Sequence, residues 1–311
     1  MLNMFPELVQ FVAGGLLLFF GAEYLIESSK SIAEKFSIPK IVVGITLVAF
    51  GTSLPELIVS IMATLRGESG IVVGNVIGSN IANIGLILGI GSIISPLCYS
   101  FSKLKGDLYF LLFITMLPIL SIQLDYMNFY TGLGYIGILF LYCYYLINSD
   151  HEVDVIDEGT SQNIAMFVII GISGLGFGSH FFVEGAVGLA EIFGIPPIII
   201  GMTIVAIGTS LPELATTLVA IKKNEASLAI GNIIGSNIMN IVAVLGISFI
   251  IKDISITSIT INAQLFVMGL LTMILFAALY FRNKLSREIG IILLGIYVVF
   301  IFLNFNSLWI G

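Results

Sequence analysis

Long apolar segments and short polar ones alternate along almost the whole chain. A helix needs about 20 mostly apolar residues to span a bilayer, and ten segments meet this requirement. They are residues 8–28, 40–65, 71–96, 107–123, 128–148, 163–185, 197–221, 228–250, 262–281 and 287–308. Within them the apolar residues run continuously rather than at every second position, which disfavours a closed β-barrel. The pattern predicts an all-α membrane protein with ten transmembrane helices.

The composition agrees with a chain that lies almost entirely in the lipid bilayer. Its residues are 58% hydrophobic and only 10% charged, whereas soluble domains carry about 25% charged residues. No polar segment is long enough for a soluble domain, and we expect no nucleic-acid partner. Cys98 and Cys143 stand far apart in apolar surroundings, so buried thiols are expected rather than a disulfide.

The two halves of the chain are related by an internal repeat. Residues 21–91 and 178–248 align without a gap at a spacing of 157 residues, with 33 identities in 71 pairs. The repeat divides the chain into a five-helix unit (1–148), an acidic linker (149–162) and a second five-helix unit (163–311). Because five is an odd number of crossings, the second unit must enter the membrane in the opposite orientation, which predicts an inverted repeat.

Lysine and arginine are distributed unevenly between the two sides of the predicted membrane. The loops after the first, third, fifth, seventh and ninth helices hold ten of them, and the other side holds only Arg66 and Lys252. Positively charged loops stay in the cytoplasm. We therefore predict a multi-pass protein of the cell membrane with both termini extracellular and the linker cytoplasmic.

A seven-residue motif, Gly-Thr-Ser-Leu-Pro-Glu-Leu, occurs once in each half, at residues 51–57 and 208–214. Its proline has no amide hydrogen and frees the carbonyl four residues earlier, so the helix is expected to be broken there. Broken backbone inside a membrane is tolerated only where protein or water satisfies it. The Thr, Ser and Glu of each motif share a helical face, which places two hydroxyls and one carboxylate beside each break.

A second duplicated motif, Gly-Asn-x-Ile-Gly-Ser-Asn-Ile-x-Asn, begins at residues 74 and 231. Ser79 and Asn83 are four residues apart and share a face, as do their repeats Ser236 and Asn240, whereas the intervening asparagines are expected to point elsewhere. These two asparagines are Asn80 and Asn237. Small residues allow helices to approach closely; those of the two helices are Gly74, Gly78, Gly85, Gly89, Gly231, Gly235 and Gly246.

Two carboxylates among many neutral oxygens form the donor set of a hard cation. Ca²⁺ takes six to eight oxygen ligands, and two Glu side chains neutralise one such ion. Zinc or copper would favour imidazole or thiolate, but His151 and His180 lie outside both motifs. Ionisable residues inside a membrane mark functional sites, so Glu56 and Glu213 are predicted to bind a transported cation, with no resident cofactor.

Taken together, the duplicated motifs resemble the α-repeats of the cation/calcium exchanger superfamily, most of all those of the prokaryotic sodium/calcium exchangers. The resemblance covers essentially the whole chain. It implies a central core of helices 2, 3, 7 and 8, across which helices 1 and 6 slide. The cation ligands that it implies are the carbonyl oxygens of Ala49 and Ala206 and the side chains of Thr52, Ser53, Glu56, Ser79, Asn83, Thr209, Ser210, Glu213, Ser236 and Asn240.

This chain departs from the family's pattern at one position: it has Asn240 where many relatives have an acid. Without that charge, obligatory K⁺ co-transport is disfavoured. The driving ion is left open between Na⁺ and H⁺ by this position alone. Sequences of the proton-driven branch differ around the acidic helices, which favours Na⁺.

We therefore expect a secondary antiporter that exports cytoplasmic Ca²⁺ in exchange for Na⁺ by alternating access, acting as a monomer. An H⁺/Ca²⁺ exchanger that uses the same two glutamates is the alternative. A passive cation channel is less favoured because inverted repeats are typical of alternating access, and no nucleophile–base pair indicates an enzyme. Four further polar residues on helices 1 and 6 are expected at the membrane interface or in a gate: Glu23, Glu27, His180 and Glu184. Asp107 and Asp125 are expected at loop edges.

Overall fold

The computed structural model describes residues 4–148, 163–194, 206–256 and 258–310. In these residues the chain is helical apart from one antiparallel pair of two-residue strands, β1 (Leu97–Cys98) and β2 (Lys284–Leu285). The first half contains α1 (Phe5–Phe36), α2 (Lys40–Val43), η1 (Gly44–Val48), α3 (Ala49–Thr52), α4 (Leu54–Arg66), α5 (Ser69–Ala82), η2 (Asn83–Leu88), α6 (Gly89–Ile94), α7 (Phe101–Gln123) and α8 (Phe129–Asn148). The second half contains α9 (Ile164–Ile192), α11 (Ala206–Gly208), α12 (Leu211–Lys222), α13 (Ala226–Met239), η4 (Asn240–Leu245), α14 (Gly246–Ile251), α15 (Ser258–Arg282) and α16 (Arg287–Ile310).

Most of the predicted spans are confirmed. Eight helices in the described residues are long and apolar enough to cross a membrane, and a ninth span is the pair Lys40–Thr52 and Leu54–Arg66, bent by 46°. The seventh predicted span, 197–221, lies partly outside the described residues, which include only α11 and α12 of it. Helices α1 and α9, at 32 and 29 residues, extend well beyond the predicted 8–28 and 163–185. At 1.5 Å per residue, α1 is about 48 Å long and exceeds the hydrocarbon thickness.

The local backbone recurs between the halves at the spacing of the sequence repeat. Each of the serines Ser53 and Ser210 precedes a proline-containing helix with φ near −85° and ψ of 6°. Two π-helical turns begin at Asn83 and Asn240. Single π turns inside α-helices frequently occur at functional sites. The breaks and the π turns therefore belong to the duplicated motifs rather than to either half alone.

The most buried spans carry the second motif. In the continuous helices Ser69–Ile94 and Ala226–Ile251, 72% and 78% of the most apolar window is buried, against 22–33% in α1 and α9. Among the expected close approaches, a Cβ at Gly231 would lie 2.8 Å from the carbonyl oxygen of Ile41, and one at Gly85 would lie 2.9 Å from Tyr297. A Cβ added at Gly74 or Gly78, by contrast, would have no described atom of another segment within 4 Å.

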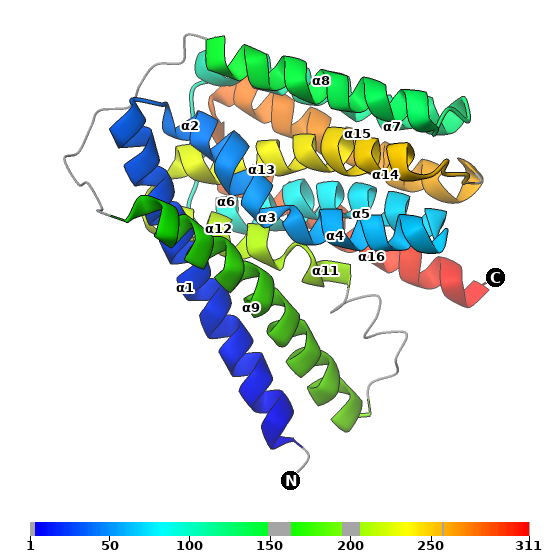
Figure 1. Cartoon of the computed structure of the whole chain (residues 1–311), viewed down its shortest axis with the longest axis horizontal. Coiled ribbons are helices and arrows are strands. Elements are labelled where there is room, and N and C mark those ends of the chain that lie inside the picture. Colours follow the sequence, from blue (N-terminus) through cyan, green and yellow to red (C-terminus); the bar gives the residue numbers. More distant parts are fainter. Residues whose placement is uncertain (1–3, 149–162, 195–205, 257, 311) are drawn as a thin grey trace.

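Helices α1 and α9 pack together as an antiparallel pair, oblique to the remaining bundle (Figure 1). Glycines spaced by seven residues form the seam: Gly14 faces Gly178 and Phe182, and Gly21 faces Gly171. A Cβ at Gly21 would lie 2.8–3.0 Å from the backbone of α9. Such spacing lets two backbones meet without intervening side chains, so the two helices form one tightly packed unit.

Two sequence expectations about polar residues are wrong. Cys98 is exposed rather than buried, although both cysteines are free as expected, because it lies in the short strand β1 at a helix end. Asp107, which flanks a predicted helix and was expected at a loop edge, is fully buried within α7. Its Oδ1 accepts a hydrogen bond from the Tyr142 hydroxyl of α8 at 2.9 Å. Residues Phe101–Gly106 extend α7 and carry Asp107 inward.

Candidate functional site

Glu56 and Glu213 lie in the first turns of α4 and α12, directly after the two helix breaks. Both side chains are fully buried. The first amide groups of a helix lack partners inside the helix and carry its positive dipole end, which stabilises a carboxylate at this place. The breaks thus place two carboxylates in the interior of the bundle, each at the N-terminus of a half-helix.

The two motifs face each other across the repeats. The Ser53 hydroxyl donates to Glu213 Oε1 at 3.0 Å, and the hydroxyls of Thr52 and Ser236 lie 3.3 Å apart. On the other side of the repeat, the hydroxyls of Thr209 and Ser79 lie near Glu56, although neither makes a hydrogen bond to its carboxylate oxygens in the described residues. Each carboxylate is therefore surrounded by hydroxyls from both halves of the chain.

Buried oxygens without hydrogen-bond partners in the described residues are concentrated in this cluster. They include both carboxylate oxygens of Glu56, Oε2 of Glu213, the side-chain oxygens of Asn83 and Asn240, and Ser210 Oγ. A buried polar atom without a partner costs about 1–3 kcal/mol, and more if it is charged. The two carboxylates also repel each other. A cation between them would satisfy these oxygens and remove the repulsion.

The chemistry of this donor set matches a hard cation. In the part of the chain that the structure describes, no three His, Cys, Asp or Glu side chains form a cluster. Carboxylate, hydroxyl, amide and carbonyl oxygens suit Ca²⁺ or Na⁺ better than zinc or copper. The donors come from α3, α4, α5, η2, α12, α13 and η4, which are the predicted second, third, seventh and eighth spans.

The expected ligands differ in how deeply they are buried in the structure. Glu56, Glu213, Thr52, Ser53, Ser79, Asn83, Ser210, Ser236 and Asn240 are all buried. The carbonyl of Ala49 accepts hydrogen bonds from Ser53 N at 2.9 Å and from Thr52 Oγ1 at 3.2 Å. Thr209 is only partly buried, and Ala206 begins α11 with no described side-chain environment. Cation binding by these twelve residues stays a prediction.

Three asparagines of the second motif contribute contacts that sequence reasoning missed. Asn237 accepts a hydrogen bond from Asn83 Nδ2 at 3.1 Å, so the expectation that it points elsewhere is wrong. Asn232 accepts from Thr52 at 3.1 Å, and Asn75 donates to the Glu56 carbonyl at 3.0 Å. Their identity in both copies of the motif was the available signal, but helical spacing alone did not indicate partners on other helices.

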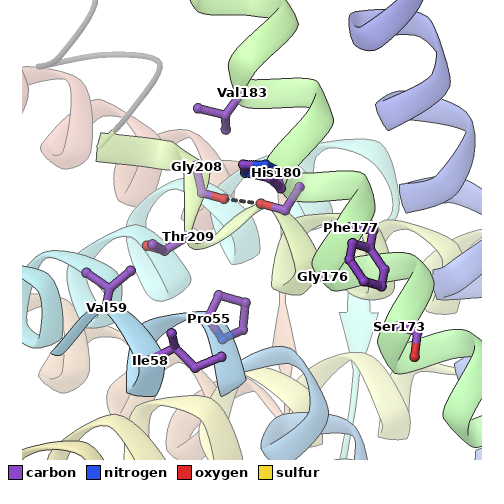
Figure 2. Close-up of a pocket in the computed structure, with 11 residues that line it drawn as sticks. Pro55, Ile58, Val59, Ser173, Gly176, Phe177, His180, Val183, Gly208 and Thr209 are labelled. Carbon is purple, nitrogen blue, oxygen red and sulfur yellow. Dashed lines mark hydrogen bonds between the residues drawn. The ribbon is translucent and has the colours of Figure 1, made fainter. Parts of the chain in front are cut away.

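A cavity of about 580 Å³ lies beside Thr209, between α4, α9 and α11 (Figure 2). Its wall is mostly apolar and includes Pro55 and Ile58 of α4 and Val183 of α9. The Ser179 hydroxyl of α9 donates to the Gly208 carbonyl at 2.6 Å. Thr209 is the expected ligand that lines this cavity, whereas Glu56 and Glu213 do not border it.

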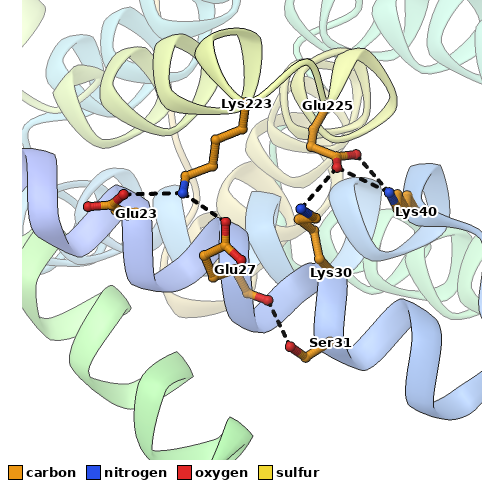
Figure 3. A network of polar contacts seen from close by, with 7 residues as sticks. All are labelled: Glu23, Glu27, Lys30, Ser31, Lys40, Lys223 and Glu225. Carbon is orange, nitrogen blue, oxygen red and sulfur yellow. Dashed lines mark hydrogen bonds and ion pairs between the residues drawn. The ribbon is translucent and has the colours of Figure 1, made fainter. Parts of the chain in front are cut away.

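A network of ion pairs ties α1 to the core (Figure 3). Lys223, at the end of α12, lies 3.1 Å from Glu23 and 2.7 Å from Glu27 of α1. Partial burial opposes the charge of Lys223, but its hydrogen bonds to the two carboxylates outweigh this effect and raise its pKa. In the turn after α12, Glu225 pairs with Lys30 at 3.3 Å and Lys40 at 3.0 Å. These contacts lie where the predicted cytoplasmic loops begin.

Comparisons with known proteins agree on one family. A family model described as sodium/calcium exchanger protein matches residues 7–148 and 163–306. Sodium/calcium exchanger MaX1 of Methanosarcina acetivorans is 33% identical, with 92% of this chain and 94% of that protein covered. The putative antiporter CaxA of Alkalimonas amylolytica is 33% identical, with 95% and 98% covered. A solved structure of the sodium-calcium exchanger NCX_Mj, soaked without Na⁺ and Ca²⁺, matches with a TM-score of 0.84 at 32% identity, covering 95% and 98% of the two chains.

Proposed function

Because this chain belongs to the sodium/calcium exchanger family, we propose that it exports cytoplasmic Ca²⁺ in exchange for Na⁺ by alternating access. The observation that carries the proposal is the pair of buried carboxylates, Glu56 and Glu213, among unpaired neutral oxygens from both repeats. Two carboxylates balance one Ca²⁺ or two Na⁺. The ions compete for the same oxygens, so binding of one displaces the other.

Alternating access requires that the cluster open to one side of the membrane at a time. The cavity beside Thr209 supports access along α9, on the predicted extracellular side. On the opposite side, the ion pairs of Lys223 and Glu225 hold α1 against the ends of α12 and α2. Helices α1 and α9 then move across the core as one unit. This movement closes the side of the cluster that was open and opens the side that was closed. A ligand shifts this equilibrium only by its different affinity for the two states.

The test is ⁴⁵Ca²⁺ uptake into proteoliposomes, which reads out exchange in either direction. Vesicles loaded with Na⁺ are compared with Na⁺-free vesicles that carry an imposed pH gradient. We expect saturable uptake that requires internal Na⁺. Uptake driven by the pH gradient alone would support the H⁺/Ca²⁺ alternative, and uptake without any counter-ion would support a channel.

Ser53→Ala is expected to weaken the dependence on Na⁺ more than the affinity for Ca²⁺. The hydroxyl bridges to Glu213, and Na⁺, with a single charge, relies more on neutral oxygens than Ca²⁺ does. Loss of one such contact of about 1 kcal/mol predicts about a fivefold increase in the half-saturating Na⁺ concentration. Ser248→Ala is the matched control, since in the described part of the chain this buried hydroxyl bonds only to the Val244 carbonyl of its own helix. Equal Na⁺ curves for Ser53→Ala and wild type would contradict the role of Ser53.

Lys223→Glu is expected to favour opening of the predicted cytoplasmic side. The change replaces two attractive pairs with two repulsive ones, and each pair contributes up to about 1 kcal/mol at the surface. The reporters are single cysteines at Ile26, which is fully buried in α1, and at its repeat Val183, which lines the cavity. In a background without Cys98 and Cys143, we expect thiol labelling to become faster at position 26 and slower at position 183.

Lys222→Glu is the matched control for this charge reversal, because Lys222 lies over the Phe19 ring at 5.3 Å rather than in the ion-pair network. Equal labelling rates in the Lys223 and Lys222 variants would contradict the role of the network. At the spacing of the repeat, Arg66 corresponds to Lys223 and Glu184 to Glu27. Reversing Arg66 is therefore expected to shift the labelling in the opposite direction.

A further inference from the structure

A neutral ligand binds a cation only if its oxygen faces the ion and its hydrogens face away. A threonine hydroxyl has one hydrogen to dispose of, and an asparagine amide has two. In a buried site, each of these hydrogens needs an acceptor behind the ligand, because an unpaired donor is costly. The residues that supply such acceptors determine whether a ligand presents its oxygen to the ion or its hydrogen.

Asn232 of α13 supplies an acceptor for Thr52. Its amide nitrogen lies 3.0 Å from Thr216 Oγ1 and 3.1 Å from Thr217 Oγ1, and Thr216 donates in turn to the Pro212 carbonyl at 2.7 Å. Since a carbonyl only accepts, this chain of bonds runs in one direction. It leaves Asn232 Oδ1 toward the Thr52 hydroxyl, 3.1 Å away, while the Ala49 carbonyl is a second acceptor at 3.2 Å. When Thr52 donates its hydrogen to Asn232, both its own lone pairs and the Ala49 carbonyl are left for the ion cluster.

Asn237 of the same helix has the same relation to Asn83. Asn83 Nδ2 donates to Asn237 Oδ1 at 3.1 Å, and both residues are buried. The Asn83 oxygen then has no partner in the described residues. Asn237 thereby takes up an amide hydrogen of Asn83, and the free oxygen is left for a cation. Both acceptors lie on α13 of the second half, and both ligands belong to the first half.

We propose that Asn232 and Asn237 are positioning residues that set the polarity of Thr52 and Asn83, so that both present oxygen to the transported cation. The assignment rests on the proposed function, because it assumes that the cluster binds Ca²⁺ and Na⁺. It also gives the duplicated asparagines a role beyond that of direct ligands. One half of the repeat supplies the ligand, and the other half supplies the acceptor that orients it.

The corresponding acceptor for the second half makes no such hydrogen bond in this structure. At the spacing of the repeat, Asn80 corresponds to Asn237 and Asn240 to Asn83, yet both amide atoms of Asn80 and of Asn240 lack partners among the described residues. The second half is also the half whose Thr209 borders the cavity. On this proposal, the Asn240–Asn80 bond forms when the cavity closes, and the second set of ligands is oriented only then.

The test is a double-mutant cycle between positions 237 and 83. Asn237→Leu keeps the approximate volume but removes the acceptor, so the Asn83 amide is free to turn its hydrogens toward the ion. We expect the apparent Kd for Ca²⁺ to rise about tenfold or more, since a reversed amide loses an ion contact and adds a repulsive one. Asn83→Asp has two oxygens and no hydrogens, and therefore needs no acceptor behind it. In the Asn83→Asp background, Asn237→Leu is expected to raise Kd less than about twofold.

Binding of ⁴⁵Ca²⁺ to the purified, detergent-solubilised protein is the readout, with size-exclusion profiles to confirm that each variant is folded. A loss of the same size in both backgrounds would overturn the positioning role, because a defect in packing does not depend on the chemistry of residue 83. An unaltered Kd in Asn237→Leu would also overturn it. If wild-type protein binds Ca²⁺ in this assay but does not couple its transport to Na⁺, the proposed exchange fails while the positioning role is still tested.

Discussion

Glu213→Gln is expected to reduce Ca²⁺ affinity and Na⁺-driven exchange by about a thousandfold, and Glu56→Gln similarly. Each variant removes one of the two charges that balance the ion. At an effective dielectric constant of about 20, two unit charges about 4 Å apart interact by about 4 kcal/mol, which corresponds to about three orders of magnitude in affinity. Glutamine has nearly the same shape, so the neighbouring hydroxyls can keep their positions.

The same variants are expected to be more stable than wild type when no Ca²⁺ or Na⁺ is present. Glu56 and Glu213 are fully buried, and their mutual repulsion ends when one of them becomes neutral. Improved stability at the expense of activity is typical of binding sites. Thermal unfolding in choline buffer with a chelator measures this effect, and ⁴⁵Ca²⁺ uptake measures the loss of exchange.

Glu288→Gln is the control for both measurements. This residue is exposed in the first turn of α16, where it interacts with Lys284 and Arg282, and it lies outside the carboxylate cluster. We expect its uptake to stay within about twofold of wild type, because exposed pairs contribute little. Normal exchange in either Glu56→Gln or Glu213→Gln would overturn the assignment of the site.

Gly235→Ala is expected to have the second-largest effect, by separating the helices that hold the site. A Cβ at this position would lie 2.6 Å from the Ala49 Cβ and would also clash with the Ile45 carbonyl. Real Cβ atoms do not approach so closely, so α13 must move away from η1 and α3. Overpacking of a tight core costs about 1–3 kcal/mol. The shift would also pull Asn232 and Ser236 of α13 away from Thr52, so exchange should fall more steeply than stability.

The matched control for this prediction is Gly269→Ala in α15, where no described atom lies within 4 Å of the added Cβ. At this position the substitution is expected to be neutral or stabilising, because the helix propensity of alanine is about 1 kcal/mol more favourable than that of glycine. Melting temperature and ⁴⁵Ca²⁺ uptake are measured for both variants. If Gly235→Ala matches Gly269→Ala in both, the close contact between α13 and α3 is not required.

Much of this protein could be predicted without coordinates because its strongest constraints are local in the chain. A helix needs about 20 apolar residues to span a bilayer, so most of the spans could be predicted from the sequence. The proline of each seven-residue motif has no amide hydrogen to donate within a helix, so the breaks before Glu56 and Glu213 could be predicted as well. A carboxylate within an apolar span is costly unless it is functional, and this identified the two central residues.

The partners of each polar group were decided only by the tertiary structure. Helical spacing shows which residues share a face, but not which helix that face meets. Asn237 was therefore assigned away from the site, whereas it contacts Asn83 from the opposite half. In the same way, Asp107 was assigned to a loop edge although α8 provides a hydroxyl for it.

The sequence by itself determined the helices, their repeat and the two buried charges, because hydrophobic length, backbone chemistry and charge are properties of single segments. The tertiary structure alone decided that Ser53 bonds to Glu213, that Lys223 pairs with Glu23 and Glu27, and that the cavity lies along α9. The two contacts join residues more than a hundred positions apart, and the cavity lies between separate helices. They depend on how the packed helices cross, and no local pattern specifies that geometry.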